Sequence, residues 1–423
     1  MKLFKKLLIP SAVFSFSTPL PGTTNELNLA EIYGYSSSEE VQNIREFNNF
    51  KVSKKNSFDL EPIANNFEAG SFSETTTMSG SASFQVGAVD GSAITEAVTA
   101  TYSYDIDLNT TFTGDDNLYV GIETGNSSTS IDFTLDSSGD GGDILNVTSL
   151  YYQFPLGSYE VAVGAELDTD DLMPTTTSKY SDSFFFGSQY GLATNYFASQ
   201  GTGAGFAVAK TFDNGFNASG SIIATGASTS GILTDAGIDV LTFSLGYDAD
   251  NYGGGIIYQK SDSLCTLYGN YVTDICNAWG VTTLLDEGYS TTTIGGYYSP
   301  GDKTTLSATT SIQDASLTGY DIDLLTDFQF AVDRELGNGT LSASWKTFPF
   351  YRIPKVGEAK SDDLGSFFEL YYTYNVNDSL EITPGISFAM PYQDAADIAA
   401  GSDVLAYYLY DRTAIGIGAT FKF

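Results

Sequence analysis

The sequence contains no histidine, and this absence removes most classes of enzyme from consideration. A Ser-His-Asp or Cys-His catalytic site needs an imidazole base, and the common zinc and iron sites use histidine as a ligand. A pair of carboxylates, as in glycoside hydrolysis, is the remaining option. Because the chain holds 52 acidic residues, some of them lie close together by chance and give no specific signal. We therefore predict no enzyme, no catalytic residues, no metal site and no cofactor.

Long apolar runs and basic residues are also scarce. Outside the N-terminus, no apolar run reaches the ~18–20 residues that a membrane-spanning helix requires. Charged residues make up 17% of the chain, below the roughly 25% of soluble domains, and the net charge is −34. No glycine-rich phosphate loop leads from a strand into a helix, and the acidic balance argues against a nucleic-acid partner.

Cysteine occurs only at Cys265 and Cys276, between two candidate strands. In an oxidising compartment these thiols either close a short loop as a disulfide or remain free. Two thiols without histidine do not favour a metal or redox site.

The chain instead shows a regular alternation of apolar with small or polar residues, most clearly at residues 415–423. Ile415, Ile417, Ala419, Phe421 and Phe423 share one face of a strand, whereas the intervening residues are glycine, threonine and lysine. The chain ends on this aromatic residue. A transmembrane β-barrel needs such a closing strand, with lipid on one side and water on the other. Phe421 and Phe423 are the candidate assembly signal for the barrel-assembly machinery.

The same period-two alternation recurs at residues 100–109, 241–248, 321–333, 368–375 and 380–390. No comparable helical periodicity competes with it, so the fold class is all-β. The chain has 28 Tyr and 29 Phe against 2 Trp, which fits two interfacial aromatic girdles. A soluble β-sandwich or a repeat adhesin also alternates, but residues 71–423 form one series without a linker. We predict a transmembrane antiparallel β-barrel in outer-membrane lipid.

Strand length predicts the size of this barrel. Spans of ~9–11 residues joined by alternate short turns and longer loops use ~20–22 residues per strand. The series therefore predicts about 16 strands, within a range of about 16–18, and a barrel of that size leaves a water-filled lumen. An energy-coupled receptor with ~22 strands and a plug does not fit.

The N-terminus indicates export. Residues 1–6 are basic, and residues 7–20 form an apolar stretch interrupted by Pro10 and Pro19, which is the layout of a signal peptide. We assign residues 1–24 to a signal peptide cleaved between Ser17 and Asn25. Residues 25–70 then form a short periplasmic segment, and residues 71–423 form the barrel, exported through the periplasm to the outer membrane.

Several segments resemble the cyanobacterial outer-membrane porins, of the carbohydrate-selective porin superfamily and its iron-uptake type. The most specific are Ser-Leu-Tyr-Tyr-Gln-Phe-Pro-Leu-Gly at 149–157 and Thr-Phe-Lys-Phe at 420–423; others lie at 26–29, 35–38, 41–44, 76–80, 109–114, 117–119 and 382–385. The resemblance implies passive diffusion of ions and small solutes, sugars and iron species among them, through a homotrimer of barrels.

One departure from that family concerns wall attachment. Its members usually carry an S-layer-homology domain and a coiled coil before the barrel. Residues 47–50 resemble the opening of that domain, yet the chain reaches Thr76 after a short polar stretch. Anchoring to peptidoglycan by this chain is therefore not expected.

Acidic residues fall on the face opposite the aromatic one, which is the lumen side of a barrel. The pore-lining candidates are Asp105, Asp107, Asp248, Asp321, Asp323, Asp327, Asp333, Glu369 and Glu381, with Lys346 and Arg412 as basic candidates. Carboxylates inside a pore favour cations, although salt screens the wall of a wide pore. Alternatively, these acids only hydrate the wall, or acids in loops bind divalent ions. The predicted function is a porin for inorganic ions and small hydrophilic solutes with a weak cation preference; the alternative is a structural or adhesive barrel with acidic surface loops.

Overall fold

The computed structural model describes residues 75–91, 98–126, 143–181, 201–234, 238–261, 289–315, 325–348, 365–390 and 412–423. The predicted signal peptide, the predicted N-terminal segment, Cys265 and Cys276 lie outside these residues.

The described residues form sixteen strands and one short helix. Their bounds are β1 Thr76–Gly91, β2 Val98–Thr110, β3 Asn117–Gly125, β4 Asn146–Leu156, β5 Tyr159–Asp168, β6 Thr202–Thr211, β7 Phe216–Thr225, α3 Ala227–Ser230, β8 Ile238–Asp248, β9 Tyr252–Ser261, β10 Tyr289–Gly301, β11 Thr304–Ala315, β12 Leu325–Glu335, β13 Gly339–Phe348, β14 Gly365–Asn377, β15 Leu380–Met390 and β16 Arg412–Lys422. Within the described residues, no helix is long and apolar enough to cross a membrane.

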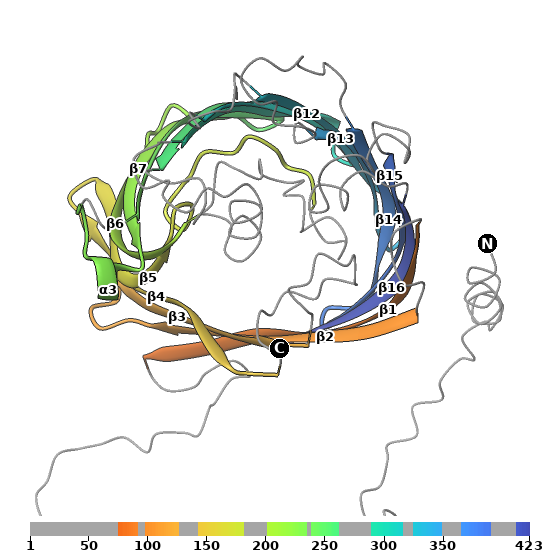
Figure 1. Cartoon of the computed structure of the whole chain (residues 1–423), viewed down its shortest axis with the longest axis horizontal. Helices are drawn as coiled ribbons and strands as arrows, with labels where there is room; N and C mark the ends of the chain where they lie inside the picture. Colours follow the sequence, from red (N-terminus) through yellow and green to blue (C-terminus); the bar gives the residue numbers. More distant parts are fainter. Residues whose placement is uncertain are drawn as a thin grey trace, which may run out of the picture. The chain divides into compact units, whose positions relative to one another are not determined.

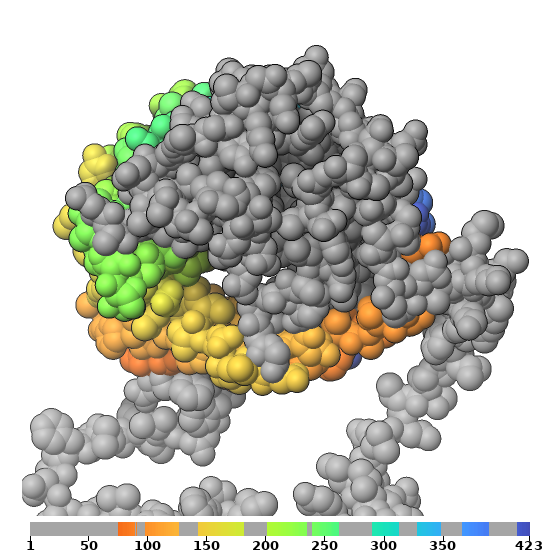
Figure 2. All heavy atoms as spheres, viewed as in Figure 1, coloured from red at the N-terminus to blue at the C-terminus, as the bar shows by residue number. Residues whose placement is uncertain are grey.

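Each strand pairs antiparallel with its sequence neighbour, and β1 pairs with β16 to close the barrel (Figure 1). The predicted all-β barrel of about sixteen strands is confirmed. In the space-filling view, β1 to β7 form one continuous wall (Figure 2). Closure leaves no strand edge unpaired, which is the condition for a sheet to span a bilayer.

The two faces of a strand differ in the way that a membrane barrel requires. In β8, Phe243 and Leu245 are 51% and 55% exposed, whereas Thr242 and Ser244 are 2% and 7% exposed. The apolar side chains thus face outward, and the polar ones face the lumen. This arrangement inverts that of a soluble protein and matches an apolar outer band around a polar interior.

The C-terminal residue completes the closure. The backbone nitrogen of Gly80 donates to the carbonyl of Phe423 at 3.0 Å, and that of Phe423 donates to the carbonyl of Gly80 at 3.1 Å. The Phe423 ring stacks on Tyr104 of β2, with centroids 5.8 Å apart. A Cβ at Gly80 would lie 2.7 Å from the Phe423 ring, so only glycine lets the ring cross β1.

Connections at the two ends of the barrel differ in length. The end that carries the C-terminus has tight turns, as between Leu156 and Tyr159 or between Gly301 and Thr304. Connections at the opposite end are longer, as between Asp168 and Thr202. This asymmetry is typical of outer-membrane barrels, whose periplasmic turns are short and whose external loops are long.

Candidate pore and inner segment

The connection after β5 enters the barrel. Residues 169–181, which we call the inner segment, run inside the ring of strands along the wall toward β14 (Figure 1). A segment that lies on the inner face of the wall in this way narrows the channel, so it is the candidate constriction.

The first part of the inner segment is fixed by hydrogen bonds and apolar packing. Thr169 is 3% exposed; its nitrogen donates to the Gly201 carbonyl at 3.2 Å, and its own carbonyl accepts from Ser221 Oγ at 3.3 Å. Leu172 packs against an apolar cluster on the lumen face of β5 to β7, formed by Ala162, Leu167, Ala207 and Ile223. Apolar contacts on the lumen side therefore exist where the inner segment covers the wall.

The middle part joins a polar network that spans three strands. Thr175 Oγ1 donates to Asn217 Oδ1 at 2.8 Å and lies 2.7 Å from Ser244 Oγ. Asn217 Nδ2 donates to Asp248 Oδ2 at 2.9 Å, and Tyr297 Oη donates to Asp248 Oδ1 at 2.8 Å. Each polar group in this network is hydrogen-bonded to its neighbour, and a buried network with all its hydrogen bonds made is rigid.

The last part crosses β10 to β14. The backbone nitrogen of Lys179 donates to Ser307 Oγ at 3.0 Å, and the Lys179 ammonium group lies 3.9 Å from the centroid of the Tyr297 ring. Tyr180 Oη then donates to Glu369. Both ends of the inner segment are therefore attached to the wall, on opposite parts of the barrel.

The predicted pore-lining acids with described side chains have lumen parity in their strands: Asp105, Asp107, Asp248, Asp333, Glu369 and Glu381. Lys346 also has lumen parity and is 3% exposed. Their partners differ. Asp105 accepts from Ser81 and Asp107 accepts from Tyr119, at 2.9 and 2.6 Å, whereas Glu381 forms an ion pair with Lys422 at 2.6 Å.

Other predicted residues lie outside the described part of the chain. They are Asp321, Asp323 and the side chains of Asp327 and Arg412.

Some lumen residues are not among the predicted ones. Glu123 follows the alternation of β3 and shares the face of buried Gly121, so its parity was a usable signal. Tyr371 and Phe367 face the lumen although they are aromatic, being 1% and 2% exposed. Lys179 sits on the inner segment, where no alternation exists to predict it.

Charge is distributed unevenly around the wall. Between Lys55 and Lys179 the sequence contains neither lysine nor arginine, so β1 to β5 carry no base of their own. Glu123, Asp105 and Asp107 lie in this stretch. Among the described residues, none of these three carboxylates forms an ion pair. The wall formed by β2 and β3 is therefore anionic.

The start of the inner segment adds further acids to this side. Desolvation, with a smaller contribution from the Asp168 carboxylate, raises the pKa of Asp170 to about 7 and that of Asp171 to about 6. Asp171 Oδ2 accepts from the Asp168 nitrogen at 2.7 Å. Carboxylates that are crowded together inside a protein are expected to have raised pKa values.

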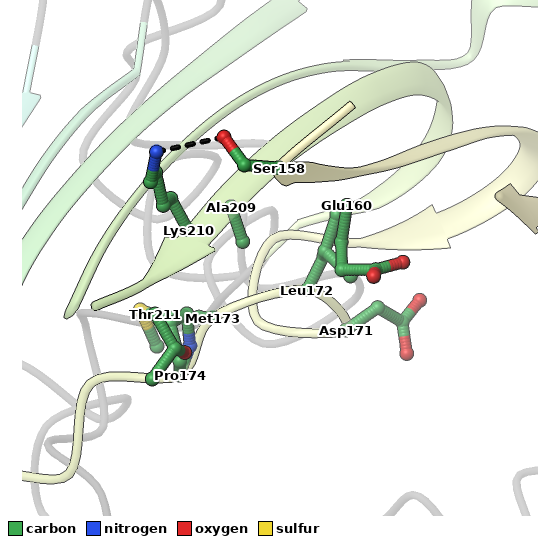
Figure 3. A pocket seen from close by; sticks show the side chains of 9 residues that line it. All are labelled: Ser158, Glu160, Asp171, Leu172, Met173, Pro174, Ala209, Lys210 and Thr211. Carbon is green, nitrogen blue, oxygen red and sulfur yellow. Dashed lines mark hydrogen bonds between the residues drawn. The ribbon is translucent and has the colours of Figure 1, made fainter. Parts of the chain in front are cut away.

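A cavity of about 450 Å³ lies beside the inner segment, near the short-turn end of β5 and β6 (Figure 3). It is lined by Ser158, Glu160, Asp171, Leu172, Met173, Pro174, Ala209, Lys210 and Thr211. Its charged groups are the carboxylates of Glu160 and Asp171 and the Lys210 ammonium group, which donates to Ser158 Oγ at 2.8 Å. Within the described residues, no group of acidic side chains is arranged to hold a metal ion.

Comparison with known proteins identifies the fold. No protein-family model and no curated protein matches the chain. Among solved structures, Pseudomonas putida OprB is similar, with a TM-score of 0.56, 11% identity, and coverage of 82% of this chain and 94% of that one. A loop-deletion mutant of OmpT, an outer-membrane protein of Vibrio cholerae, gives a TM-score of 0.52 with 12% identity and covers 82% of this chain and 99% of that one. A mutant of the Rh. blastica porin gives a TM-score of 0.50 with 12% identity and covers 82% of this chain and 100% of that one. The chain therefore has the barrel fold of bacterial outer-membrane porins.

Proposed function

We propose that this chain is an outer-membrane porin that lets inorganic ions and small hydrophilic solutes diffuse passively. The observation that carries the proposal is a closed sixteen-strand barrel, in the described residues, whose polar face lines the lumen and whose inner segment lies against that face. Barrels of about this size leave an aqueous channel rather than a packed core.

A weak cation preference follows from the wall charges. Asp105, Asp107 and Glu123 lie on the lumen side of the stretch that has no lysine or arginine. Fixed carboxylates in a low-dielectric wall raise the local concentration of cations. Across the lumen, the Lys179 ammonium lies on the Tyr297 ring, which is hydrogen-bonded to Asp248, and Lys346 is buried on the lumen face of β13, so that side is closer to neutral.

Further parts of the proposal come from the sequence resemblance. The chain is a cyanobacterial porin of the iron-uptake type, with sugars and iron species among its solutes. It reaches the outer membrane through the periplasm by way of its signal peptide, is inserted by the barrel-assembly machinery and forms a homotrimer. Chemical cross-linking of the purified protein tests the trimer.

Current through a planar bilayer is the direct test of the function. The purified full chain should give discrete steps of nanosiemens scale, with a reversal potential favouring potassium over chloride in a salt gradient. A folded, inserted barrel without conductance would favour the structural or adhesive role instead. Chloride preference would keep the porin and place control at a basic constriction, with Lys179 and Lys346 as first candidates.

A further inference from the structure

A carboxylate of β14 lies beneath the end of the inner segment. Glu369 is fully buried, and Tyr180 Oη donates a hydrogen bond to its Oε1. Tyr180 is 4% exposed and packs edge-on against Tyr371, with ring centroids 6.2 Å apart. A charge-assisted hydrogen bond that is closed to solvent is stronger than the same bond in water. Glu369 therefore holds Tyr180 and does not line the open channel.

A second carboxylate, that of Asp333 on β12, accepts hydrogen bonds from the next residue of the inner segment, Ser181. Asp333 Oδ2 accepts from the Ser181 nitrogen at 3.0 Å, and its Oδ1 accepts from Ser181 Oγ at 2.6 Å. Ser342 Oγ of β13 donates to the same Oδ1 at 2.5 Å. Asp333 thus connects the inner segment to two strands of the wall.

Glycines form a bare strip of wall under the middle of the inner segment. Gly246, Gly255 and Gly295 are register partners on three successive strands, β8, β9 and β10. A Cβ at Gly255 would lie 2.3 Å from Thr175 Cγ2, and one at Gly295 would lie 2.3 Å from the Thr177 carbonyl oxygen. The inner segment can approach the wall this closely only because these positions lack side chains.

We infer that Asp333 and Glu369 are positioning residues, which hold the inner segment on its glycine strip and thereby set the width of the channel rather than its preference for cations. This inference rests on the proposed porin function. It separates two kinds of lumen carboxylate that look alike in the sequence. Asp333 and Glu369 accept hydrogen bonds from the inner segment. Asp105 and Asp107 instead accept hydrogen bonds from the neighbouring wall residues Ser81 and Tyr119.

Three double variants of the full chain separate width from preference. Asp333→Ala with Glu369→Ala removes both charge and hydrogen bonds; Asp333→Asn with Glu369→Gln removes the same charge and keeps an acceptor at each position. Asp105→Asn with Asp107→Asn removes an equal charge from the other wall. Single-channel conductance and the cation-to-anion permeability ratio are measured for each in a planar bilayer.

The alanine pair should change conductance by about twofold and increase current noise, with the permeability ratio shifting by less than about 1.5-fold. The Asn/Gln pair should restore a conductance close to that of the unmodified chain. The Asp105/Asp107 pair should instead lower the permeability ratio by about threefold at low salt, with little change in conductance. Gel mobility with and without heating confirms that each variant is folded.

Equal losses of permeability ratio in the Asn/Gln pair and the Asp105/Asp107 pair would overturn the inference, because charge number alone would then matter. An unchanged conductance in the alanine pair would overturn it too. If the alanine pair does not fold, Tyr180→Phe makes the same test from the inner segment and should alter conductance without altering the permeability ratio. Absence of current in the unmodified chain would refute the porin function itself, which is a separate result.

Discussion

Neighbouring side chains along one strand meet different surroundings in this barrel, and single substitutions should reveal the difference. Leu370 is 38% exposed on the outer face of β14, whereas Thr373 belongs to the lumen face. Not every lumen position is wet, however. Ser244 is 7% exposed because it lies 2.7 Å from Thr175, so a lysine there would displace the inner segment.

Lysine substitutions on the two faces of β14 should differ in cost. Leu370→Lys places an ammonium group against lipid and should destabilise the folded barrel by about 2–4 kcal/mol if it lies near the midplane. Thr373→Lys places it in the lumen and should be tolerated. Urea-induced unfolding in lipid vesicles measures both, and equal destabilisation would mean that the faces are misassigned.

Acidification should weaken the cation preference through Asp170 and Asp171. Their pKa values are raised to about 7 and about 6, so both lose their charge as the pH falls from 8 to 5. Since the raised values exceed those of an unfolded chain, ionisation of these groups opposes folding, and this penalty is relieved on acidification. The reversal potential should therefore move toward zero without unfolding.

The matched control for this pH effect is Asp170→Asn with Asp171→Asn. This variant should show a weaker pH dependence between 8 and 5 than the unmodified chain. An identical pH profile would assign the effect to other carboxylates.

At the scale of elements, closure depends on the meeting of β1, β2 and β16. Gly80 and Phe423 exchange two backbone hydrogen bonds, and the Phe423 ring reaches Tyr104 across β1. Phe421 also contacts Phe84 of β1, with ring centroids 6.1 Å apart. The aromatic residues proposed as an assembly signal thus also pack at the seam.

Two changes at this seam should impair insertion. Deletion of Phe423 removes the stacking on Tyr104, and Gly80→Val places a side chain 2.3 Å from the Asp105 carbonyl and against the Phe423 ring. Both should reduce the outer-membrane fraction and leave periplasmic aggregates, as measured by fractionation and heat-modifiable mobility. Gly157→Asn is the control, since a Cβ at Gly157 meets no atom within 4 Å and asparagine tolerates its φ of 67°. Normal insertion of both seam variants would remove the seam from the assembly step.

At the scale of the whole molecule, the lumen has an anionic side and a more nearly neutral side. The first is formed by β2, β3 and the start of the inner segment; the second includes Lys179 of the inner segment and Lys346 of β13. Arg334 of β12 has the outward parity of its strand and does not add to the charge of the lumen, and Lys422 is paired with Glu381.

This asymmetry makes the selectivity dependent on salt. The cation-to-anion permeability ratio should fall toward that of free solution as ionic strength rises, because the screening length drops from ~10 Å at 0.1 M to ~3 Å at 1 M. Reversal potentials at a fixed concentration ratio and increasing total salt measure the effect. A ratio independent of salt would indicate a narrow filter rather than a charged wall.

The sequence predicted the strands of the barrel wall better than the segment and the aromatic side chains that lie inside the lumen. Alternation gave Asp105, Asp107 and Asp333 the lumen parity of their strands, because a strand leaves each side chain only two directions. It missed Tyr371, since aromatic residues were assigned to lipid and this one packs under Tyr180. It also missed the inner segment, whose contacts join residues far apart in the chain.

The sequence by itself therefore determined the all-β class, the approximate strand number and the two faces of the wall, because period and span length are local properties. Only the tertiary structure decided that the connection after β5 turns inward, that glycines of β8 to β10 receive it and that Asp333 and Glu369 hold it. Those features depend on which strands face each other across a closed ring. A lumen carboxylate can line the open channel or lie under the inner segment, and the residues next to it in the sequence do not distinguish these two positions.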